Sequence, residues 1–134
     1  MASIIREFAV DADEETAWAA LVDVGAVNKL ITFLGPVTLD GDVRTVDMGE
    51  YGTIEELIVS VDDEPRRMSY SVRKSPWNFV HHHSVMEILP PEEGAVGSRV
   101  RWLVDLKPDS LAEEIATGMD GAVESMKQSL AAVT

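Results

Sequence analysis

The last part of the chain constrains the fold most, because its apolar residues recur with the spacing of a helix. Seven apolar residues between positions 111 and 133 are separated by four, four, three, four, four and three positions. This spacing places them on one face of a long amphipathic helix, which we predict over residues 109–131. Gly118 and Gly121 lie inside it and each cost about 1 kcal/mol relative to alanine. The apolar face consists of Leu111, Ile115, Met119, Ala122, Met126, Leu130 and Val133.

The region before this helix consists of short strand-like runs separated by turn residues, of which Asp40-Gly41 is a hairpin signal. Repeated turns favour an antiparallel meander over parallel crossovers. Another strand-like run, residues 4–10, is followed by two short helical patterns, the first beginning near a capping box at Asp11 and Glu14, the second over residues 27–34. We therefore predict one α+β domain over residues 1–134. It has about seven antiparallel strands in a curved sheet around the C-terminal helix, with two short helices after the first strand.

Composition excludes several classes of function. The chain has no cysteine, which excludes disulfides, thiolate metal sites and a cysteine nucleophile. Its 24 acidic and 11 basic residues give a net charge of −13, whereas nucleic acids and anionic membranes are bound through clustered lysine and arginine. No apolar run is long enough to span a membrane, and Arg6 and Glu7 interrupt the N-terminal run. We expect a cytoplasmic protein, monomeric or homodimeric, without a nucleic-acid partner or membrane insertion.

Motifs spread over nearly the whole chain resemble those of one superfamily. They are Trp18 in the first helical pattern, the strand GDVRTV, the segment GTIEELIVSVDDEPRRMSYSV with Gly52, Glu56, Asp62, Asp63, Arg67 and Tyr70, and the strand GSRVRWLVDLKP with Trp102. In order and spacing they are similar to the START-like, or SRPBCC, superfamily, and within it to bacterial polyketide cyclase/dehydrase-like proteins.

The resemblance implies a helix-grip fold that encloses an apolar cavity. It implies no cofactor and carries over no catalytic motif. Members of the superfamily include aromatic-polyketide cyclases, lipid and hormone binders, quinone-binding proteins and chaperone activators, so the fold leaves the function open.

Alternation along the strands assigns side chains to the two faces of the sheet. It turns Trp102 inward. The family pattern turns Glu56 inward beside Arg44, whereas hydrophobicity alone would turn Leu57 and Val59 inward. An inward Arg44–Glu56 pair would be either a polar anchor for a ligand or a structural ion pair. We predict a ligand cavity lined by Arg44, Glu56, Tyr70, His82, Ser84, Met86, Trp102, Met119 and Ala122.

Three consecutive histidines lie in the predicted strand FVHHHSVMEIL. Alternation turns His82 inward with Val80, and turns His81 and His83 outward with Phe79. Because a stable site usually needs more than two protein ligands, we predict no metal at the outward pair. The inward His82 is either an acid–base group or a core histidine that bonds to Tyr70 or Ser84.

Three functions are compatible with these patterns. The first is binding of a small apolar or aromatic ligand of the polyketide, lipid or quinone class. The second is a cyclase or dehydratase in which His82 or Glu56 removes a proton while Arg44 or Tyr70 stabilises the enolate oxygen. The third is an interaction module whose acidic surface binds a basic protein. Because candidate acids and bases do not by themselves establish turnover, we rank ligand binding first.

Overall fold

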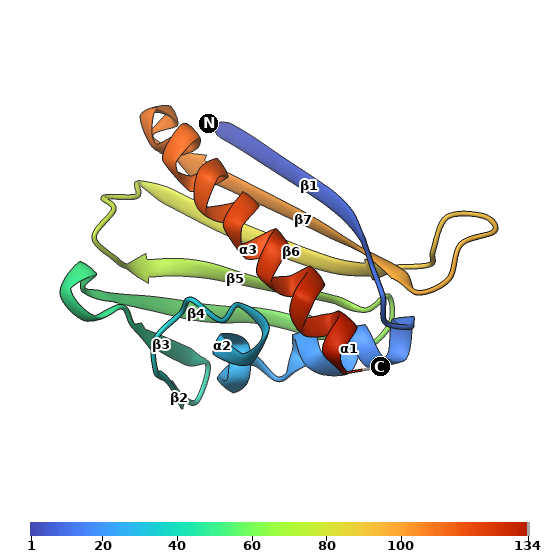
Figure 1. Cartoon of the computed structure of the whole chain (residues 1–134). Helices are drawn as coiled ribbons and strands as arrows, with labels where there is room; N and C mark the ends of the chain where they lie inside the picture. Colours follow the sequence, from blue (N-terminus) through green and yellow to red (C-terminus); the bar gives the residue numbers. More distant parts are fainter. Residues whose placement is uncertain (134) are drawn as a thin grey trace.

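The computed structural model describes residues 1–133, and its elements follow the predicted order (Figure 1). The seven strands form one antiparallel sheet in the order β1-β7-β6-β5-β4-β3-β2. This confirms the α+β helix-grip prediction. The elements are β1 (Ala2–Val10), α1 (Glu14–Val22), α2 (Val27–Leu30), β2 (Val37–Asp40), β3 (Val43–Asp47), β4 (Thr53–Asp62), β5 (Arg67–Lys74), β6 (His81–Leu89), β7 (Ser98–Lys107) and α3 (Ala112–Ala132).

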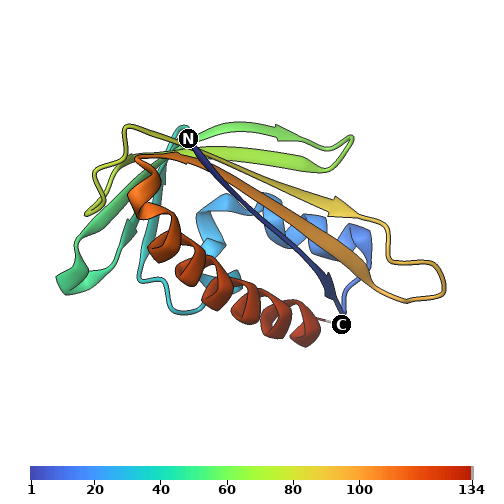
Figure 2. The same cartoon turned by 90° about the horizontal axis from the view of Figure 1, so that it is seen from above.

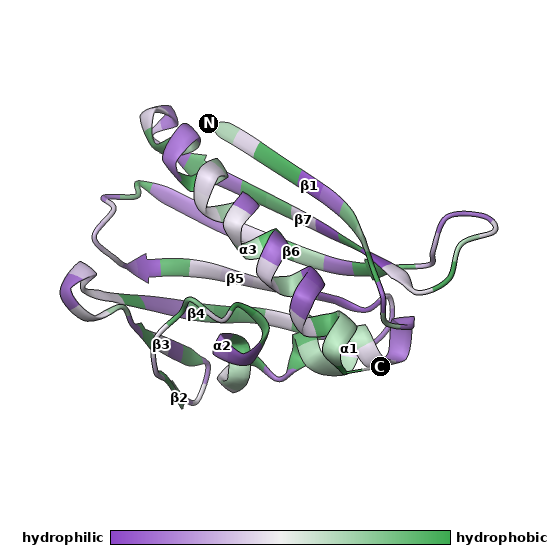
Figure 3. Ribbon diagram, in the orientation of Figure 1, coloured by the Kyte–Doolittle hydropathy of each residue, from purple (hydrophilic) through white to green (hydrophobic). Residues whose placement is uncertain are grey.

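The sheet is strongly curved, and all three α-helices lie on its concave side (Figure 2). Hydrophobic and hydrophilic residues alternate along the strands, which gives the sheet one apolar face (Figure 3). That face and the helices enclose a core in which Val100, Leu106 and Met126 are fully buried. None of the helices in residues 1–133 is long and apolar enough to cross a membrane.

The long helix α3 is continuous through Gly118 and Gly121, as its apolar spacing predicts. A 3-10 turn, Asp109–Leu111, precedes it, so the predicted start at residue 109 corresponds to this turn. The buried residues of α3 are Met119, Ala122, Val123, Met126 and Leu130. The middle and the C-terminal half of the helix are therefore its most deeply buried parts.

The two short helices differ in detail from the prediction. Asp13, not Asp11, caps α1, because its Oδ1 accepts a hydrogen bond from the backbone N–H of Thr16 at 2.8 Å. The second helix ends at Leu30 rather than residue 34. The Leu30 carbonyl accepts hydrogen bonds from the hydroxyls of Ser125 and Ser129 on α3, at 3.2 and 2.9 Å. Contacts with a distant helix thus take the place of the next helical turn.

The start of β6 also differs from the prediction. We expected Val80 to face inward and Phe79 outward, but Val80 is 80% exposed and Phe79 packs against the core. The strand begins only at His81, so its alternation does not extend back to these two residues.

Candidate ligand-binding site

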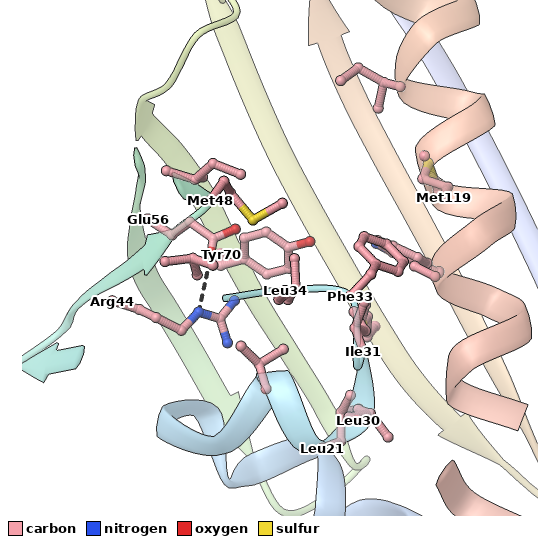
Figure 4. A pocket seen from close by; sticks show the side chains of 18 of the residues that line it. Leu21, Leu30, Ile31, Phe33, Leu34, Arg44, Met48, Glu56, Tyr70 and Met119 are labelled. Carbon is pink, nitrogen blue, oxygen red and sulfur yellow. Dashed lines mark hydrogen bonds and ion pairs between the residues drawn. The ribbon is translucent and has the colours of Figure 1, made fainter. Parts of the chain in front are cut away.

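The concave side of the sheet contains a cavity of about 200 Å³, between β3–β7 and the three helices (Figure 4). Phe33 and Glu114 on its wall are exposed, so the cavity meets solvent near them. The lining is mostly apolar and consists of Ala20, Leu21, Val27, Leu30, Ile31, Phe33, Leu34, Arg44, Val46, Met48, Ile54, Glu56, Met68, Tyr70, Trp77, Met86, Trp102, Glu114, Ile115, Gly118, Met119 and Ala122.

One wall of this cavity carries a buried ion pair. Arg44 on β3 and Glu56 on β4 are direct cross-strand neighbours, and their side chains meet with Arg44 Nε 2.7 Å from Glu56 Oε1. Arg44 Nη1 also donates a hydrogen bond to the Val24 carbonyl at 3.1 Å. Both partners are almost fully buried, so each charge depends on the other for compensation.

Tyr70 on β5 extends this polar wall toward the middle of the cavity. The guanidinium carbon of Arg44 lies 5.1 Å from the centre of its ring, within the range of a cation–π contact. Burial, and next the charge of Glu56, raise the pKa of Tyr70 to about 12. The hydroxyl is therefore protonated at neutral pH and can donate a hydrogen bond.

Two effects oppose each other at Glu56. Burial raises the pKa of its carboxyl group, and the charge and hydrogen bond of Arg44 lower it, with burial the larger effect. Protonation of Glu56 would leave the Arg44 cation uncompensated in an apolar wall. The Arg44 cation therefore favours the ionised form of Glu56.

A cavity between a curved sheet and a long helix agrees with the known protein family that the sequence matches. The whole chain, residues 1–134, matches the family described as "Polyketide cyclase / dehydrase and lipid transport". The chain belongs to this family. None of the curated proteins compared with it matches its sequence.

Solved structures of similar fold come from several bacteria. An uncharacterised protein from Bacillus thuringiensis has a TM-score of 0.85 at 18% identity, over 96% of this chain and 98% of its own. The protein XoxI from Bacillus cereus has a TM-score of 0.82 at 19% identity, over 97% of this chain and 96% of its own. A protein from Thermobifida fusca has a TM-score of 0.82 at 23% identity, over 98% of this chain and 91% of its own. At these identities the likeness establishes the fold of this polyketide cyclase/dehydrase family member and nothing further.

The structure places seven of the nine residues predicted to bind a ligand on the cavity wall. Arg44, Glu56, Tyr70, Met86, Trp102, Met119 and Ala122 are on its wall, and His82 and Ser84 are not. Glu56 takes the inward orientation that the family pattern favours. Ser84 is fully buried next to the wall, where its Oγ accepts a hydrogen bond from Trp102 Nε1 at 2.8 Å. Ser84 thereby fixes the indole of a lining residue.

His82 faces inward, but its ring is hydrogen-bonded to the backbone of the neighbouring strand. Its Nδ1 accepts a hydrogen bond from the N–H of Val72 at 3.0 Å, and its carbonyl accepts one from Ser71 Oγ. The regular pairing of β5 with β6 ends at Tyr70 and Ser84, so these bonds connect the strands where they diverge.

The environment of His82 also determines its charge. Its ring lies 5.0 Å from that of Phe79 and 5.9 Å from that of Tyr70, measured between centres. Burial, and next the charges of His83 and His81, lower the pKa of His82 to about 4. The imidazole is therefore neutral at pH 7, with Nδ1 as an acceptor.

The two remaining histidines lie on the other face of β6. His81 is exposed and His83 is half-buried. Within the described chain, no group of three or more histidines and carboxylates is arranged to hold a metal ion.

Several lining residues were not among the predicted ones. Phe33 and Leu34 come from the segment between α2 and β2, and Met48 follows β3. Trp77, in the loop before β6, also lines the cavity, and its sequence context KSPWN is typical of an aromatic residue on a loop. For Phe33 the sequence carried no comparable signal, because its position depends on how the loop packs beside α3.

Proposed function

We propose that this protein binds a small apolar or aromatic molecule, of the polyketide, lipid or quinone class, in the cavity between sheet and α3. The observation that carries the proposal is an apolar cavity with a single polar wall. Its volume of about 200 Å³ is more than ten times the roughly 10–15 Å³ that one water needs. Pockets of this kind, apolar with a few placed polar groups, are typical of small-molecule sites.

The lining residues divide into two roles in this proposal. Trp102, Met86 and Met119 supply apolar contact, and methionines adapt to irregular ligand shapes. Arg44 and the Tyr70 hydroxyl orient the ligand by donating hydrogen bonds to a carbonyl or hydroxyl oxygen. His82 would act indirectly, by holding β5 and β6 together beside the cavity.

Turnover is the second candidate function, and the position of Glu56 favours it. A buried carboxylate on the wall of an apolar cavity is placed to accept a proton from a bound carbonyl compound, with Tyr70 and Arg44 close by to stabilise the resulting oxyanion. Binding remains the first proposal, because Glu56 is already bonded to Arg44. A Glu56→Gln variant that binds a substrate but no longer converts it would support turnover.

The binding proposal can be tested with the probe 9-anthracenemethanol. Trp77 and Trp102 line the cavity, so a bound anthracene should quench their fluorescence by energy transfer. The variant Ala122→Phe places a bulky side chain on the buried, cavity-lining face of α3. We expect saturable quenching in the wild type and at least about ten-fold weaker binding in this variant.

Ala132→Phe is the matched control, because it makes the same substitution at an exposed position near the end of the same helix. It should bind the probe like the wild type, and circular dichroism should show that both variants are folded. Equal binding by Ala122→Phe and the wild type, or no saturable quenching at all, would contradict the proposal. Native mass spectrometry of protein purified without added ligand would show whether it retains a molecule.

A further inference from the structure

We propose that the cavity selects uncharged ligands and that the Arg44–Glu56 pair enforces this selection. The inference rests on the proposed binding function and narrows its ligand class. Among the described residues that line the cavity, three are charged: Arg44, Glu56 and Glu114. The first two form the buried pair, and the third is exposed where the cavity opens.

An anionic ligand has no free cation to bind inside this cavity. The charge of Arg44 is already compensated by Glu56 at 2.7 Å, and a second bond, to the Val24 carbonyl, fixes the guanidinium. A ligand carboxylate near Arg44 would lie beside the Glu56 carboxylate, in a wall with little solvent to screen the repulsion. Glu114 at the opening and the net charge of −13 add repulsion on the way in.

A cationic ligand also has no free counter-charge to bind inside the cavity. Glu56 is the one carboxylate on the inner wall as the structure describes it, and it is bonded to Arg44. The phenol of Tyr70 is buried and stays neutral. A ligand ammonium would meet the Arg44 cation and lose its hydration without gaining a counter-charge. Glu114 attracts a cation only at the solvent-exposed opening, where ion pairs contribute little.

An uncharged ligand oxygen, by contrast, has hydrogen-bond donors available on this wall. The two bonds of the guanidinium use Nε and Nη1, so the N–H groups of Nη2 lie outside them. The Tyr70 hydroxyl, from the same wall, points toward the middle of the cavity (Figure 4). A ligand hydroxyl or carbonyl can accept from these donors while its apolar body contacts the remaining lining. The favoured class is therefore an uncharged aromatic or polycyclic molecule that carries a hydroxyl or carbonyl group, rather than a fatty acid or an amine.

Three probes with one skeleton test this directly on the wild-type protein. They are 9-anthracenemethanol, 9-anthracenecarboxylate and 9-(aminomethyl)anthracene, which at pH 7 are neutral, anionic and cationic. We expect the alcohol to bind at least about ten-fold more tightly than either ion, measured by quenching of tryptophan fluorescence. A carboxylate or an amine that binds as tightly as the alcohol would overturn the selection while leaving the proposed function intact. If none of the three binds, the proposed function itself fails.

The variant Glu56→Gln tests whether the pair is the cause. It keeps the size of the side chain and an oxygen that accepts from Arg44, but leaves the guanidinium charge uncompensated. We expect the carboxylate probe to bind at least about ten-fold more tightly than it does to the wild type, and its affinity relative to that of the alcohol to rise. Glu93→Gln is the matched control, since it removes an exposed carboxylate that does not line the cavity, and it should change the affinity for the carboxylate probe less than about three-fold.

An unchanged affinity of folded Glu56→Gln for the carboxylate would overturn the role of the pair. An equal gain in both variants would assign the selection to general surface charge and would also overturn it. Circular dichroism establishes whether Glu56→Gln is folded. If it is not, the three-probe comparison on the wild type still decides whether charged ligands are excluded.

Discussion

The Arg44–Glu56 pair and His82 are polar and lie on the concave side of the sheet, but their side chains have different bonding partners. The Arg44–Glu56 pair on β3 and β4 lies on the cavity wall, where we propose that the remaining donors of Arg44 bind a ligand. His82 on β6 is equally buried, but its ring accepts a hydrogen bond from the backbone of β5. Facing inward is therefore not enough to make a residue part of a site. The difference is that the backbone already occupies the acceptor nitrogen of His82, whereas Arg44 has N–H groups outside its two hydrogen bonds.

The largest effect should follow from breaking the ion pair. Arg44→Leu leaves Glu56 without a counter-charge in an apolar wall, and we expect a loss of about 3–5 kcal/mol in the free energy of unfolding. The double variant Arg44→Leu, Glu56→Leu removes both charges and should recover most of the loss. Urea unfolding measures both. A double variant as unstable as the single one would mean that the pair stabilises the fold by more than mutual compensation.

His82 should make the stability of the protein depend on pH. Its pKa is about 4 in the folded state, below the value of about 6.5 in an unfolded chain, so between these values the unfolded state binds more protons. The contribution of neutral His82 is complete above pH 6.5 and is lost as the pH falls toward 4, by up to about 3 kcal/mol.

This pH dependence should be absent from His82→Asn, whose side chain does not titrate. Urea unfolding of the wild type and the variant at several pH values between 7 and 4 isolates the histidine, because carboxylates titrate in both proteins. Parallel stability curves for the two proteins would show that His82 is not held neutral by its surroundings.

The hydrogen bond of His82 should matter by a smaller amount. His82→Ala leaves the N–H of Val72 without its acceptor, and we expect the free energy of unfolding at pH 7 to fall by about 2 kcal/mol. His82→Asn retains an acceptor oxygen close to the position of Nδ1 and should lose less. Equal losses in the two variants would indicate that ring packing against Phe79 and Tyr70, rather than the hydrogen bond, is the contribution of this residue.

The smallest expected effect separates helix stability from cavity shape. Gly118 lines the cavity and Gly121 does not, yet a Cβ at either position has no atom nearer than 3.9 Å. Gly118→Ala and Gly121→Ala should each raise the free energy of unfolding by about 1 kcal/mol, through helix propensity. Thermal unfolding measures the gain, and neither variant should alter binding of 9-anthracenemethanol. A destabilised Gly118→Ala would show that the cavity wall is tighter than the structure indicates.

Much of the architecture could be predicted because local patterns report it. The spacing from Leu111 to Val133 determined α3, since the helical period fixes which side chains share a face. Alternation likewise turned Tyr70, Met86 and Trp102 toward the cavity. The first residue of an element was harder to predict. The inward orientation predicted for Val80 was wrong, because β6 starts only at His81.

The sequence by itself thus determined the order of the elements, the family and the face on which most of the cavity residues lie. Only the tertiary structure decided what each inward polar group bonds to. The divergence of β5 from β6 beyond Tyr70 gives His82 a backbone partner, and the packing of the loop after α2 beside α3 brings Phe33 to the opening. These contacts join residues that are far apart in the chain, and no local period encodes them, because they depend on how the sheet curves and where the helices dock.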